Sequence, residues 1–208
     1  MSKKLIITGL APLVAEAASL VKELQPEREI EQVTLNWLDQ FRFDASWIEE
    51  IVPASCDLFV AIDARTVNFS RLELFSLLKS KGFALVRLIS PRACVDPHQR
   101  IGENSIIHGG STLSSSVQCG YNSVIRTGAV IESGCRIGNS VWIGPGAVIG
   151  MGAFIGDNTT IGPGVIIDEN VKIGKQCEIF QPGLYRQHLA DKTFYAAGYD
   201  RPVRIVKF

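Results

Sequence analysis

The chain has 208 residues with 21 basic and 21 acidic side chains, so its formal net charge at neutral pH is zero. This balance argues against nucleic acid as a partner, because phosphate binding requires a net basic surface. No apolar run approaches the roughly 18 residues that span a bilayer, and the amino terminus has no cleavable signal, so we expect no membrane insertion and a cytoplasmic location.

Residues 1–90 alternate between strand-like and helix-like segments. Short apolar runs bounded by turn residues predict strands, and apolar residues three or four apart predict helices. The expected elements, in chain order, are a strand at 4–8, a helix at 13–24, a strand at 57–63, a helix at 69–82 and a strand at 84–89. Between the first helix and the second strand, "EIEQVTL" suggests a further strand and "DASWIEEIV" a short helix. The alternation predicts a small parallel sheet with helices on its faces.

From Val95 to Ile179 a large residue returns at every sixth position, over 15 hexapeptides without an insertion. A period of six fits neither a helix nor a long strand, and it predicts a β-solenoid in which each hexapeptide forms one short strand and one corner. The large residue should point inward, and the small residue four positions later should fit the narrow corner. The glycine that often follows the large residue is expected to permit positive φ and crowding.

The pattern resembles the hexapeptide repeat of left-handed parallel β-helix acyltransferases, in which three hexapeptides form one triangular coil. The whole chain is similar to one branch of these enzymes, the sialic acid O-acetyltransferases and the bacillosamine-type nucleotide-sugar N-acetyltransferases. Besides the repeats, the resembling segments are "KKLIITG", "DLFVAIDARTVNFSR", "LKSKGFALVRLISPRACV" and "AAGYDRPVR". The resemblance implies a Rossmann-like α/β nucleotide-sugar-binding domain at 1–90, a left-handed β-helix acyltransferase domain at 91–184 and a C-terminal extension at 185–208. It also implies a homotrimer that uses acetyl-CoA.

The α/β domain is expected to bind the UDP part of a UDP-linked amino sugar, because open α/β sheets bind ligands at the carboxyl ends of their strands. The loop after the first strand keeps only one glycine of the glycine-rich loop usual in the family. The expected UDP contacts are Gly9, Leu10, Ala11, Asp63, Ala64, Arg65 and Arg71. Among them, Asp63 would hydrogen-bond uracil or ribose, and Arg65 or Arg71 would meet phosphate.

The catalytic histidine of the family aligns on Ser133, and a polar residue seven positions earlier aligns on Arg126. Serine cannot act as a general base near neutral pH. The adjacent Glu132 is either a base or a solvated corner residue. With 18 residues per coil, His108 lies under Arg126 rather than under Ser133. By the same register, the N–H near Met151, one coil above Ser133, is the expected oxyanion donor.

Acetyl-CoA is expected to lie along the later coils. Its expected contacts are Trp142, Gly144, Ala147, Met151 and Gly162, with Arg201, Arg204 and Lys207 available to its phosphates. The apolar side chains of Trp142, Met151 and Phe154 also favour a homotrimer, because exposed apolar patches usually mark interfaces.

The remaining histidines and the cysteines do not predict a metal site. His98 and His188 are more typical of surface polar residues, and with His108 they lack the spacing of the zinc site in β-helical carbonic anhydrases. The five cysteines are odd in number and form no CxxC pair, so neither a disulfide framework nor a zinc site is expected.

Three functions fit these residues. The first is N-acetylation of a UDP-linked amino sugar without a histidine base, because an amine with a pKa near 8 is already partly neutral at neutral pH. The second is O-acetylation of a sugar, with His108 or Glu132 as a relocated base. The third is a trimeric scaffold or sugar-nucleotide-binding protein without catalytic activity.

Overall fold

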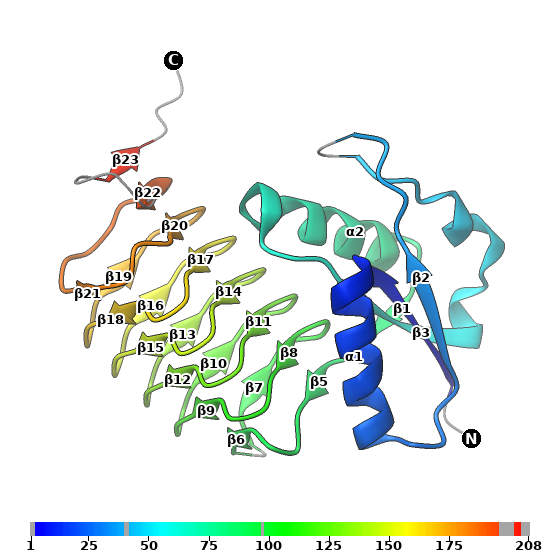
Figure 1. Ribbon diagram of the computed structural model, residues 1–208, viewed down its shortest axis with the longest axis horizontal. Helices are drawn as coiled ribbons and strands as arrows, with labels where there is room; N and C mark the ends of the chain where they lie inside the picture. Colours follow the sequence, from blue (N-terminus) through cyan, green and yellow to red (C-terminus); the bar gives the residue numbers. More distant parts are fainter. Residues whose placement is uncertain (1–2, 40–41, 97, 196–201, 205–208) are drawn as a thin grey trace. The chain divides into compact units, whose positions relative to one another are not determined.

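The computed structural model describes residues 3–39, 42–96, 98–195 and 202–204, and the chain forms two compact units, Met1–Leu88 and Ile89–Phe208. Figure 1 labels the elements of both units. In the described ranges, no helix is long and apolar enough to cross a bilayer.

The first unit is a four-stranded parallel sheet with the strand order β2-β1-β3-β4. Its elements are β1 (Lys4–Gly9), α1 (Ala11–Leu24), β2 (Ile30–Thr34), the 3-10 helices Ser46–Glu50, Pro53–Ser55 and Arg65–Asn68, β3 (Cys56–Ala61), α2 (Phe69–Ser80) and β4 (Ala84–Leu85). One face of the sheet, with Ile6 and Leu58, packs with Leu74 and Leu78 of α2. This arrangement confirms the expected α/β unit.

The strand expected at 84–89 is two separate strands. β4 pairs with β3 in the first unit, whereas β5 (Leu88–Ile89) pairs with a strand of the solenoid. The division follows from the period of six: Ile89 precedes Val95 by one repeat and packs against the solenoid core. The ladder of large residues therefore begins one hexapeptide earlier than the sequence pattern suggested.

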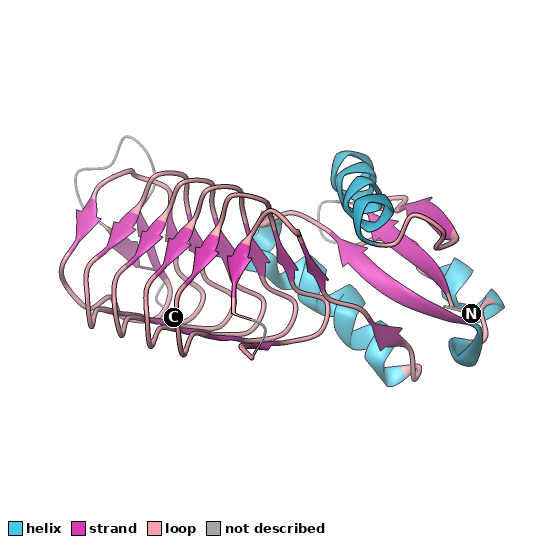
Figure 2. Ribbon diagram, turned by 90° about the horizontal axis from the view of Figure 1, so that it is seen from below, coloured by secondary structure: helices cyan, strands magenta, loops and turns pink. Residues whose placement is uncertain are grey.

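The second unit is the expected left-handed parallel β-helix, whose coils stack as three sheets (Figures 1 and 2). The β8 face consists of β5, β8 (Ile106–Ile107), β11 (Val124–Ile125), β14 (Trp142–Ile143), β17 (Thr160–Ile161), β20 (Glu178–Ile179), β22 (Thr193–Tyr195) and β23 (Val203–Arg204). The β9 face consists of β6 (Cys94–Val95), β9 (Thr112–Leu113), β12 (Val130–Ile131), β15 (Val148–Ile149), β18 (Ile166–Ile167) and β21 (Leu184–Tyr185). The β10 face consists of β7 (Arg100–Ile101), β10 (Gln118–Cys119), β13 (Arg136–Ile137), β16 (Phe154–Ile155) and β19 (Lys172–Ile173).

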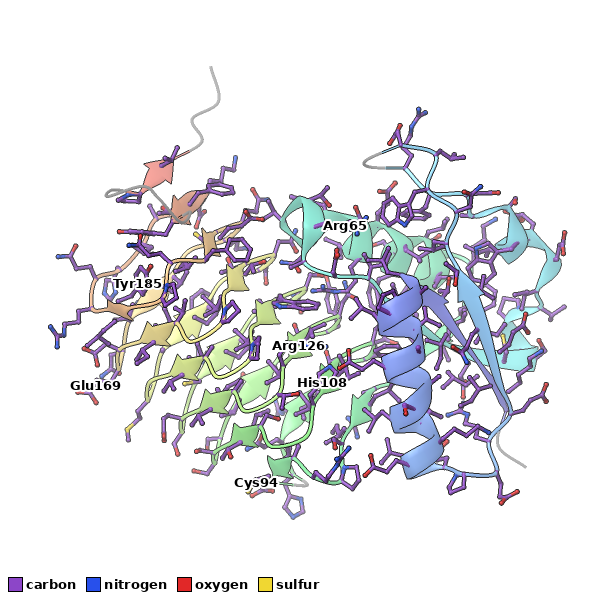
Figure 3. All side chains as sticks on the ribbon, viewed as in Figure 1. Arg65, Cys94, His108, Arg126, Glu169 and Tyr185 are labelled. Atoms are coloured by element: carbon purple, nitrogen blue, oxygen red, sulfur yellow. The ribbon has the colours of Figure 1, made fainter. Side chains whose placement is uncertain are left out.

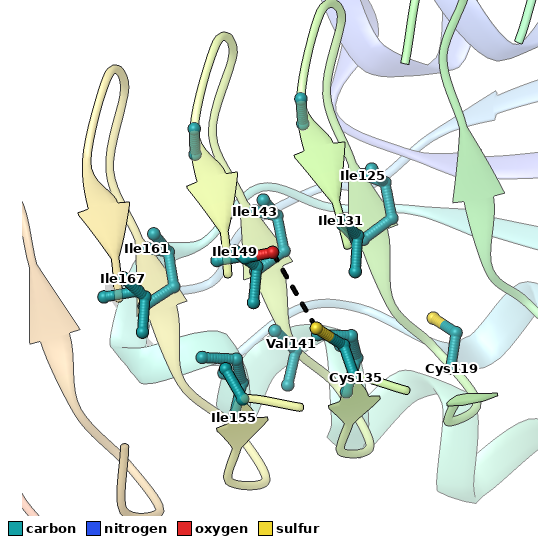
Figure 4. Packing of buried hydrophobic residues seen from close by; sticks show 14 of the residues in the cluster. Cys119, Ile125, Ile131, Cys135, Val141, Ile143, Ile149, Ile155, Ile161 and Ile167 are labelled. Carbon is teal, nitrogen blue, oxygen red and sulfur yellow. Dashed lines mark hydrogen bonds between the residues drawn. The ribbon is translucent and has the colours of Figure 1, made fainter. Parts of the chain in front are cut away.

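Each short strand directs its second residue into the solenoid and its first residue outward. Ile131 pairs with Ile149 on the next coil, and both are completely buried (Figure 4). The small residue of each repeat fills the corner, as expected; Cys135, also buried, lies against the Ile149 carbonyl. Because the ladder of isoleucines is continuous, the hydrophobic effect stabilises every coil against its neighbours.

Three corners connect the faces, and each is named here by its order along the chain. The first corner, from the β8 face to the β9 face, comprises 108–111, 126–129, 144–147 and 162–165. The second corner, from the β9 face to the β10 face, comprises 114–117, 132–135, 150–153 and 168–171. The third corner, from the β10 face to the β8 face, comprises 102–105, 120–123, 138–141, 156–159 and 174–177.

The corner residues with positive φ do not lie at the position that the sequence pattern predicted. The left-handed residue is the third after each large residue, and from 104 to 176 every repeat has positive φ there: Asn104, Gly110, Ser116, Asn122, Gly128, Gly134, Ser140, Gly146, Gly152, Asn158, Gly164, Asn170 and Gln176. The glycine directly after the large residue has no positive φ. Glycine is needed at this position because the neighbouring coil leaves no room for a side chain. A Cβ on Gly144 would lie 2.7 Å from the backbone of Gly162. The expected crowding is confirmed and the expected positive φ is wrong.

The solenoid continues into the tail that the sequence pattern treated as an extension. Tyr185 pairs with Ile167, Leu189 bridges Ile173, and Tyr195 pairs with Ile179. Ile179 and Tyr195 are 16 residues apart, whereas Ile161 and Ile179 are 18 apart. This shorter coil breaks the period of six, which is why the pattern does not reveal it.

Candidate functional site

The loop after β1 lies against the carboxyl end of β3, as the sequence suggested. Leu10 N–H donates to the Ala61 carbonyl at 2.9 Å, and a Cβ on Gly9 would lie 2.0 Å from that oxygen. Glycine is therefore required at position 9 for close packing.

α1 begins at the exposed Ala11 without a side-chain cap. Pro12 has no N–H, and the N–H groups of Leu13 and Val14 both donate to the Leu10 carbonyl at 2.9 Å. In the first turn of α1, the Ala11 N–H is therefore the donor that remains available to a ligand at this edge.

Asp63 and Arg65 meet at the same edge of the sheet. The Arg65 guanidinium donates from Nε to Oδ1 of Asp63 at 2.7 Å and from Nη2 to Oδ2 at 3.1 Å. The hydrogen bond to Asp63 raises the pKa of Arg65. The guanidinium also lies over the ring of Trp37, 4.8 Å from its centroid (Arg65 is labelled in Figure 3). Trp37 was not predicted, since the chain after β2 gives no regular pattern.

The backbone between Asp63 and α2 is strained. Thr66, Val67 and Asn68 all have positive φ, although two of them are β-branched. Such residues cost on the order of 1–3 kcal/mol each and concentrate at ligand-binding sites. The half-buried Ala64 accepts a hydrogen bond from Asn68 N–H at 3.3 Å, and α2 begins directly afterwards without a cap from the Asn68 side chain. In its first turn, the Ser70 N–H donates to Oγ1 of Thr66 at 3.2 Å, so the strained segment itself caps this end of α2.

Arg71 corrects one expectation about phosphate binding. The residue is 1% exposed, and its Nη1 donates to the carbonyls of Ile62 and Asp63, each at 3.3 Å. Burial lowers the pKa of Arg71 to about 9, so it is still protonated at neutral pH. Its guanidinium holds the chain after β3 in place from inside and does not face a ligand. Arg65 is the exposed arginine at this edge.

The second corner brings Glu132, Ser133 and Met151 together. Gly152 N–H donates to the Ser133 carbonyl at 3.0 Å, which places Met151 on the coil next to Ser133. Glu132 and Ser133 are half-buried, and Met151 is 55% exposed. The Ser133 hydroxyl lies 3.2 Å from the hydroxyl of Ser115 on the other neighbouring coil. Ser115 was not predicted, although the spacing of 18 residues could have identified it.

Backbone N–H groups at the second corner are available to a ligand. In the described residues, no group accepts a hydrogen bond from the N–H of Ser133 or Met151. At the third corner, side chains cap the N–H groups of Tyr121, Asn139 and Lys175, which hold the same repeat position. Asn139 accepts from Tyr121 N–H at 3.2 Å, and Asp157 accepts from Asn139 N–H at 2.9 Å. The Met151 N–H therefore has the freedom that an oxyanion donor requires.

His108 lies at the first corner and is 7% exposed. Its Nε2 is 3.1 Å from Nη1 of Arg126, so the spacing of one coil between them is confirmed (Figure 3). The Arg126 guanidinium also lies 5.6 Å from the ring centroid of Trp142. Because a guanidinium has no acceptor, Nε2 of His108 must accept this hydrogen bond and cannot at the same time take a proton from a substrate. Within one chain, His108 and Ser133 belong to different corners.

The residues expected to contact acetyl-CoA divide into exposed and buried ones. Trp142 is half-buried with its ring outward, whereas Gly144, Ala147 and Gly162 are buried inside the first corner, so their expected contact is corrected. On the two later coils, the exposed residues of that corner are Pro145, Gly146, Pro163 and Gly164. Arg201 and Lys207 lie outside the described residues, and Arg204 is described only as the end of β23.

The other histidines and the cysteines have no catalytic geometry. Nδ1 of His188 accepts a hydrogen bond from Lys172 N–H at 3.0 Å, which secures the shortened coil. His98 is exposed near the first coil. Burial raises the pKa of Cys119 to about 12, so its thiol is not a nucleophile at neutral pH. The described parts of the chain contain no group of three or more potential metal ligands.

Comparison with known proteins bears on the repeat and on the fold. Residues 146–181 match the family described as bacterial transferase hexapeptide (six repeats). These residues carry the hexapeptide repeat of that family. A comparison of its sequence with curated proteins gives no significant match.

Solved structures resemble this protein over nearly its whole length. The acetyltransferase domain of PglB from Neisseria gonorrhoeae, solved with acetyl coenzyme A, is 21% identical with a TM-score of 0.81 and covers 98% of this chain and 100% of its own. PerB from Caulobacter crescentus, solved with CoA and GDP-perosamine, is 24% identical with a TM-score of 0.78 and covers 92% of both chains. WeeI from Acinetobacter baumannii is 18% identical with a TM-score of 0.66 and covers 97% of this chain and 100% of its own. The resemblance found in the sequence is thus confirmed for the repeat and for the fold.

Proposed function

We propose that the protein transfers the acetyl group of acetyl-CoA to the amino group of a nucleotide-linked amino sugar, with UDP as the expected nucleotide. The observation that carries the proposal is the second corner, where the uncapped Met151 N–H lies one coil from Ser133 and Glu132. The similar structures support the proposal, since one was solved with acetyl coenzyme A and another with CoA and GDP-perosamine. A cytoplasmic location stays a prediction.

The proposed reaction needs little from the protein beyond positioning. The lone pair of the neutral amine attacks the thioester carbonyl, a C–N bond forms, the C–S bond breaks, and one proton passes from nitrogen to the departing CoA sulfur or to solvent. Met151 N–H would stabilise the oxyanion of the tetrahedral intermediate. An amine with a pKa near 8 is about a tenth neutral at pH 7, so no base is required before attack. Glu132 is the side chain beside Ser133 that could accept the released proton.

The nucleotide is proposed to bind at the carboxyl edge of β1 and β3. The exposed Asp63–Arg65 pair offers one carboxylate and one guanidinium, and the start of α1 next to Gly9 offers the N–H of Ala11. These groups suit a base or ribose and a diphosphate. Arg71 has no place in this site because it is buried.

The alternative reactions are less well supported. Attack by a sugar hydroxyl needs a base, because the pKa of a hydroxyl is far above 7. His108 is a poor candidate, since its Nε2 is engaged by Arg126. Glu132 is the remaining candidate for a relocated base. A scaffold without activity would give the uncapped Met151 N–H no role.

A homotrimer is proposed on a different surface from the one expected. Trp142, Met151 and Phe154 lie on the β8 face, at the second corner and on the β10 face, so they do not form one patch. The outward positions of the β9 face form a continuous column of mostly apolar residues: Cys94, Thr112, Val130, Val148, Ile166 and Leu184. Ile166 is 41% and Leu184 47% exposed, which favours this face as a contact between subunits.

The proposed function is tested with acetyl-CoA and purified UDP- and GDP-linked amino sugars. Mass spectrometry should detect a product heavier by one acetyl group and free CoA with at least one of these acceptors. The same sugars with a hydroxyl in place of the amine should not react. Product from the hydroxyl sugars alone would establish O-acetylation, and no product from any acceptor would favour the scaffold.

A further inference from the structure

The outward side chains of the β10 face form a column whose chemistry differs from that of the apolar column on the β9 face. The strands of the β10 face lie side by side along the solenoid (Figure 1), and their outward residues, all exposed, are Arg100, Gln118, Arg136, Phe154 and Lys172. These five residues are called the β10 column here. The proposed reaction does not use the column, and the proposed contact between subunits lies on the β9 face.

The three cations of the column are unpaired in the described part of the chain. The side chains of Arg100, Arg136 and Lys172 form neither an ion pair nor a hydrogen bond there. By contrast, the exposed Lys175 at the adjoining third corner pairs with Asp157 at 2.9 Å. A row of unpaired cations on a rigid support attracts a partner with several negative charges.

The cations are evenly spaced along the column. Gln118 pairs in register with both Arg100 and Arg136, and Phe154 pairs with both Arg136 and Lys172, so successive cations are two coils apart. Since coils stack at about 4.8 Å, these backbone positions are about 9.6 Å apart. A polyproline II helix has three residues per turn and rises about 3.1 Å per residue, so every third side chain lies on one side at intervals of about 9.3 Å. A β-strand repeats at about 6.7 Å and an α-helix at about 5.4 Å, and neither stays in step with the column.

The two uncharged residues of the column suit the remainder of such a peptide. Phe154, which is 37% exposed, stands between Arg136 and Lys172 and offers an aromatic surface. Aromatic side chains are the usual contacts of proline-rich peptides in this conformation. Gln118 stands between Arg100 and Arg136 and offers an amide. Because a polyproline II helix has no internal hydrogen bonds, its backbone carbonyls are available to that amide.

Acidic residues at the adjoining corners favour a narrow partner over a broad one. Glu132 and Glu169 lie at the second corner, before the strands of the β10 face, and Glu103 lies at the third corner, after them. An anionic membrane would contact these corners together with the column and would be repelled by the glutamates. Anionic membranes also select clusters of about four to eight basic residues, more than the column has. A single extended chain would follow the column alone.

We infer that the β10 column binds an extended, proline-containing segment of a partner protein that carries an acidic residue at every third position. Its carboxylates pair with Arg100, Arg136 and Lys172, and one of its prolines packs on Phe154. Carboxylates outside this register would face the glutamates of the corners, so the spacing of the charges selects the partner in addition to their number. The inference does not depend on the proposed acetyl transfer.

The test compares two synthetic peptides that contain three glutamates each. In the spaced peptide, two prolines separate successive glutamates; in the clustered peptide, which has the same composition, the glutamates are adjacent. Fluorescence anisotropy at low ionic strength gives the Kd of each labelled peptide with the full-length protein. The column variants are Arg136→Gln and the triple variant Arg100→Gln, Arg136→Gln and Lys172→Gln. The control, Arg186→Gln, removes an exposed charge of the solenoid outside the column.

The native protein should bind the spaced peptide at least fivefold more tightly than the clustered one. Arg136→Gln should raise the Kd of the spaced peptide about fivefold, the upper range for one exposed ion pair, and the triple variant should raise it at least tenfold. Arg186→Gln should leave this Kd unchanged. Equal affinity for the two peptides, no binding of the spaced peptide, or native affinity in the triple variant would overturn the inference.

Sedimentation with vesicles of phosphatidylcholine and phosphatidylserine tests the membrane in the same buffer. We expect the native protein to stay in the supernatant. If the native protein sediments, the triple variant does not, and the peptides bind equally, the column binds an anionic membrane and the inference is wrong.

Discussion

The second and third corners of the solenoid have the same repeat, but their polar groups have different partners. At the third corner, side chains of one coil cap backbone N–H groups of the previous coil, as Asp157 does for Asn139. Inside that corner, Asn122 accepts from Asn104 at 2.7 Å and donates to Ser140 at 2.8 Å. At the second corner, the N–H groups of Ser133 and Met151 have no acceptor in the described part of the chain.

The two corners of the same repeat therefore differ in role: one stabilises the fold, and the other is the candidate site of the reaction. The third corner satisfies its polar groups internally and thereby holds the register of the coils. The second corner leaves donors unpaired on a rigid support, and preorganised donors of this kind stabilise charge that develops during a reaction. The predictions below exchange features between corners, beginning with the change that should have the largest effect.

The first variant places a proline at the second corner, at the repeat position where the first corner has proline. Met151 occupies the repeat position that proline holds in Gly144–Pro145–Gly146 and Gly162–Pro163–Gly164, and it too lies between glycines. Met151→Pro therefore removes the N–H from a backbone position that accepts proline elsewhere in the same fold. We expect kcat to fall by 10²–10³, the usual cost of losing one oxyanion donor, with little change in Tm.

Met151→Ala is the matched control, because it removes the side chain and keeps the N–H. It should retain kcat within a few-fold. Steady-state rates and thermal denaturation of both variants show whether the N–H or the side chain of Met151 contributes to the reaction. Equal rates for the proline and alanine variants would show that this N–H does not stabilise the reaction.

The second pair of variants removes one aromatic side chain near the first corner and one on the outside of the β10 face. Trp142→Ala removes the ring that the guanidinium of Arg126, a residue of the first corner, contacts. If acetyl-CoA lies along this corner, its KM should rise about tenfold, within the range that one aromatic contact contributes. Phe154→Ala removes another exposed aromatic residue, at the β10 face, and should leave the KM unchanged. A rise for Phe154→Ala and none for Trp142→Ala would move the cofactor to the other face.

How far the sequence alone predicts this molecule depends on whether a feature repeats. The isoleucine ladder and the position of His108 under Arg126 follow from a strict period of six, and both are confirmed. The last coil was missed because it is shorter by two residues. The left-handed corner residue was missed because Gly, Asn, Ser and Gln all serve there, so no single residue type marks it.

The site residues follow the same rule. Ser133 and Met151 could be placed by counting coils. The burial of Arg71 could not be predicted, and neither could the three successive residues with positive φ at Thr66–Asn68, because neither feature repeats in the sequence.

The third change tests whether the second corner needs a base at all. Ser133→Ala and Glu132→Gln should each lower the rate less than tenfold, well below the 10²–10⁴ typical of a general base. The rate should rise with pH as the substrate amine loses its proton, with the same midpoint in both variants and in the native enzyme. His108→Asn is the control at the first corner. If that variant alone lost about 10³-fold while remaining folded, the histidine would be the base.

The smallest effect is expected at the third corner, from Asp157→Asn. Burial acts to raise the pKa of Asp157, but the Asn139 N–H and Lys175, whose Nζ lies 2.9 Å away, together lower it below its ordinary value. A carboxyl with a lowered folded-state pKa stabilises the protein above its unfolded-state pKa of roughly 4, and this stabilisation is lost as the pH falls through the lower folded value. The asparagine can still accept from the Asn139 N–H, so only the charge is removed.

Because the Asp157 side chain is 37% exposed, solvent screens the pair, and the difference in unfolding free energy at neutral pH should be less than about 1 kcal/mol. Urea denaturation at several pH values should show this difference above about pH 4 and its disappearance in more acidic buffer. Acetyl transfer should not change, since the third corner supports the fold and takes no part in the reaction. A variant that unfolds normally but loses most of its activity would show that the two corners do not have the separate roles assigned to them.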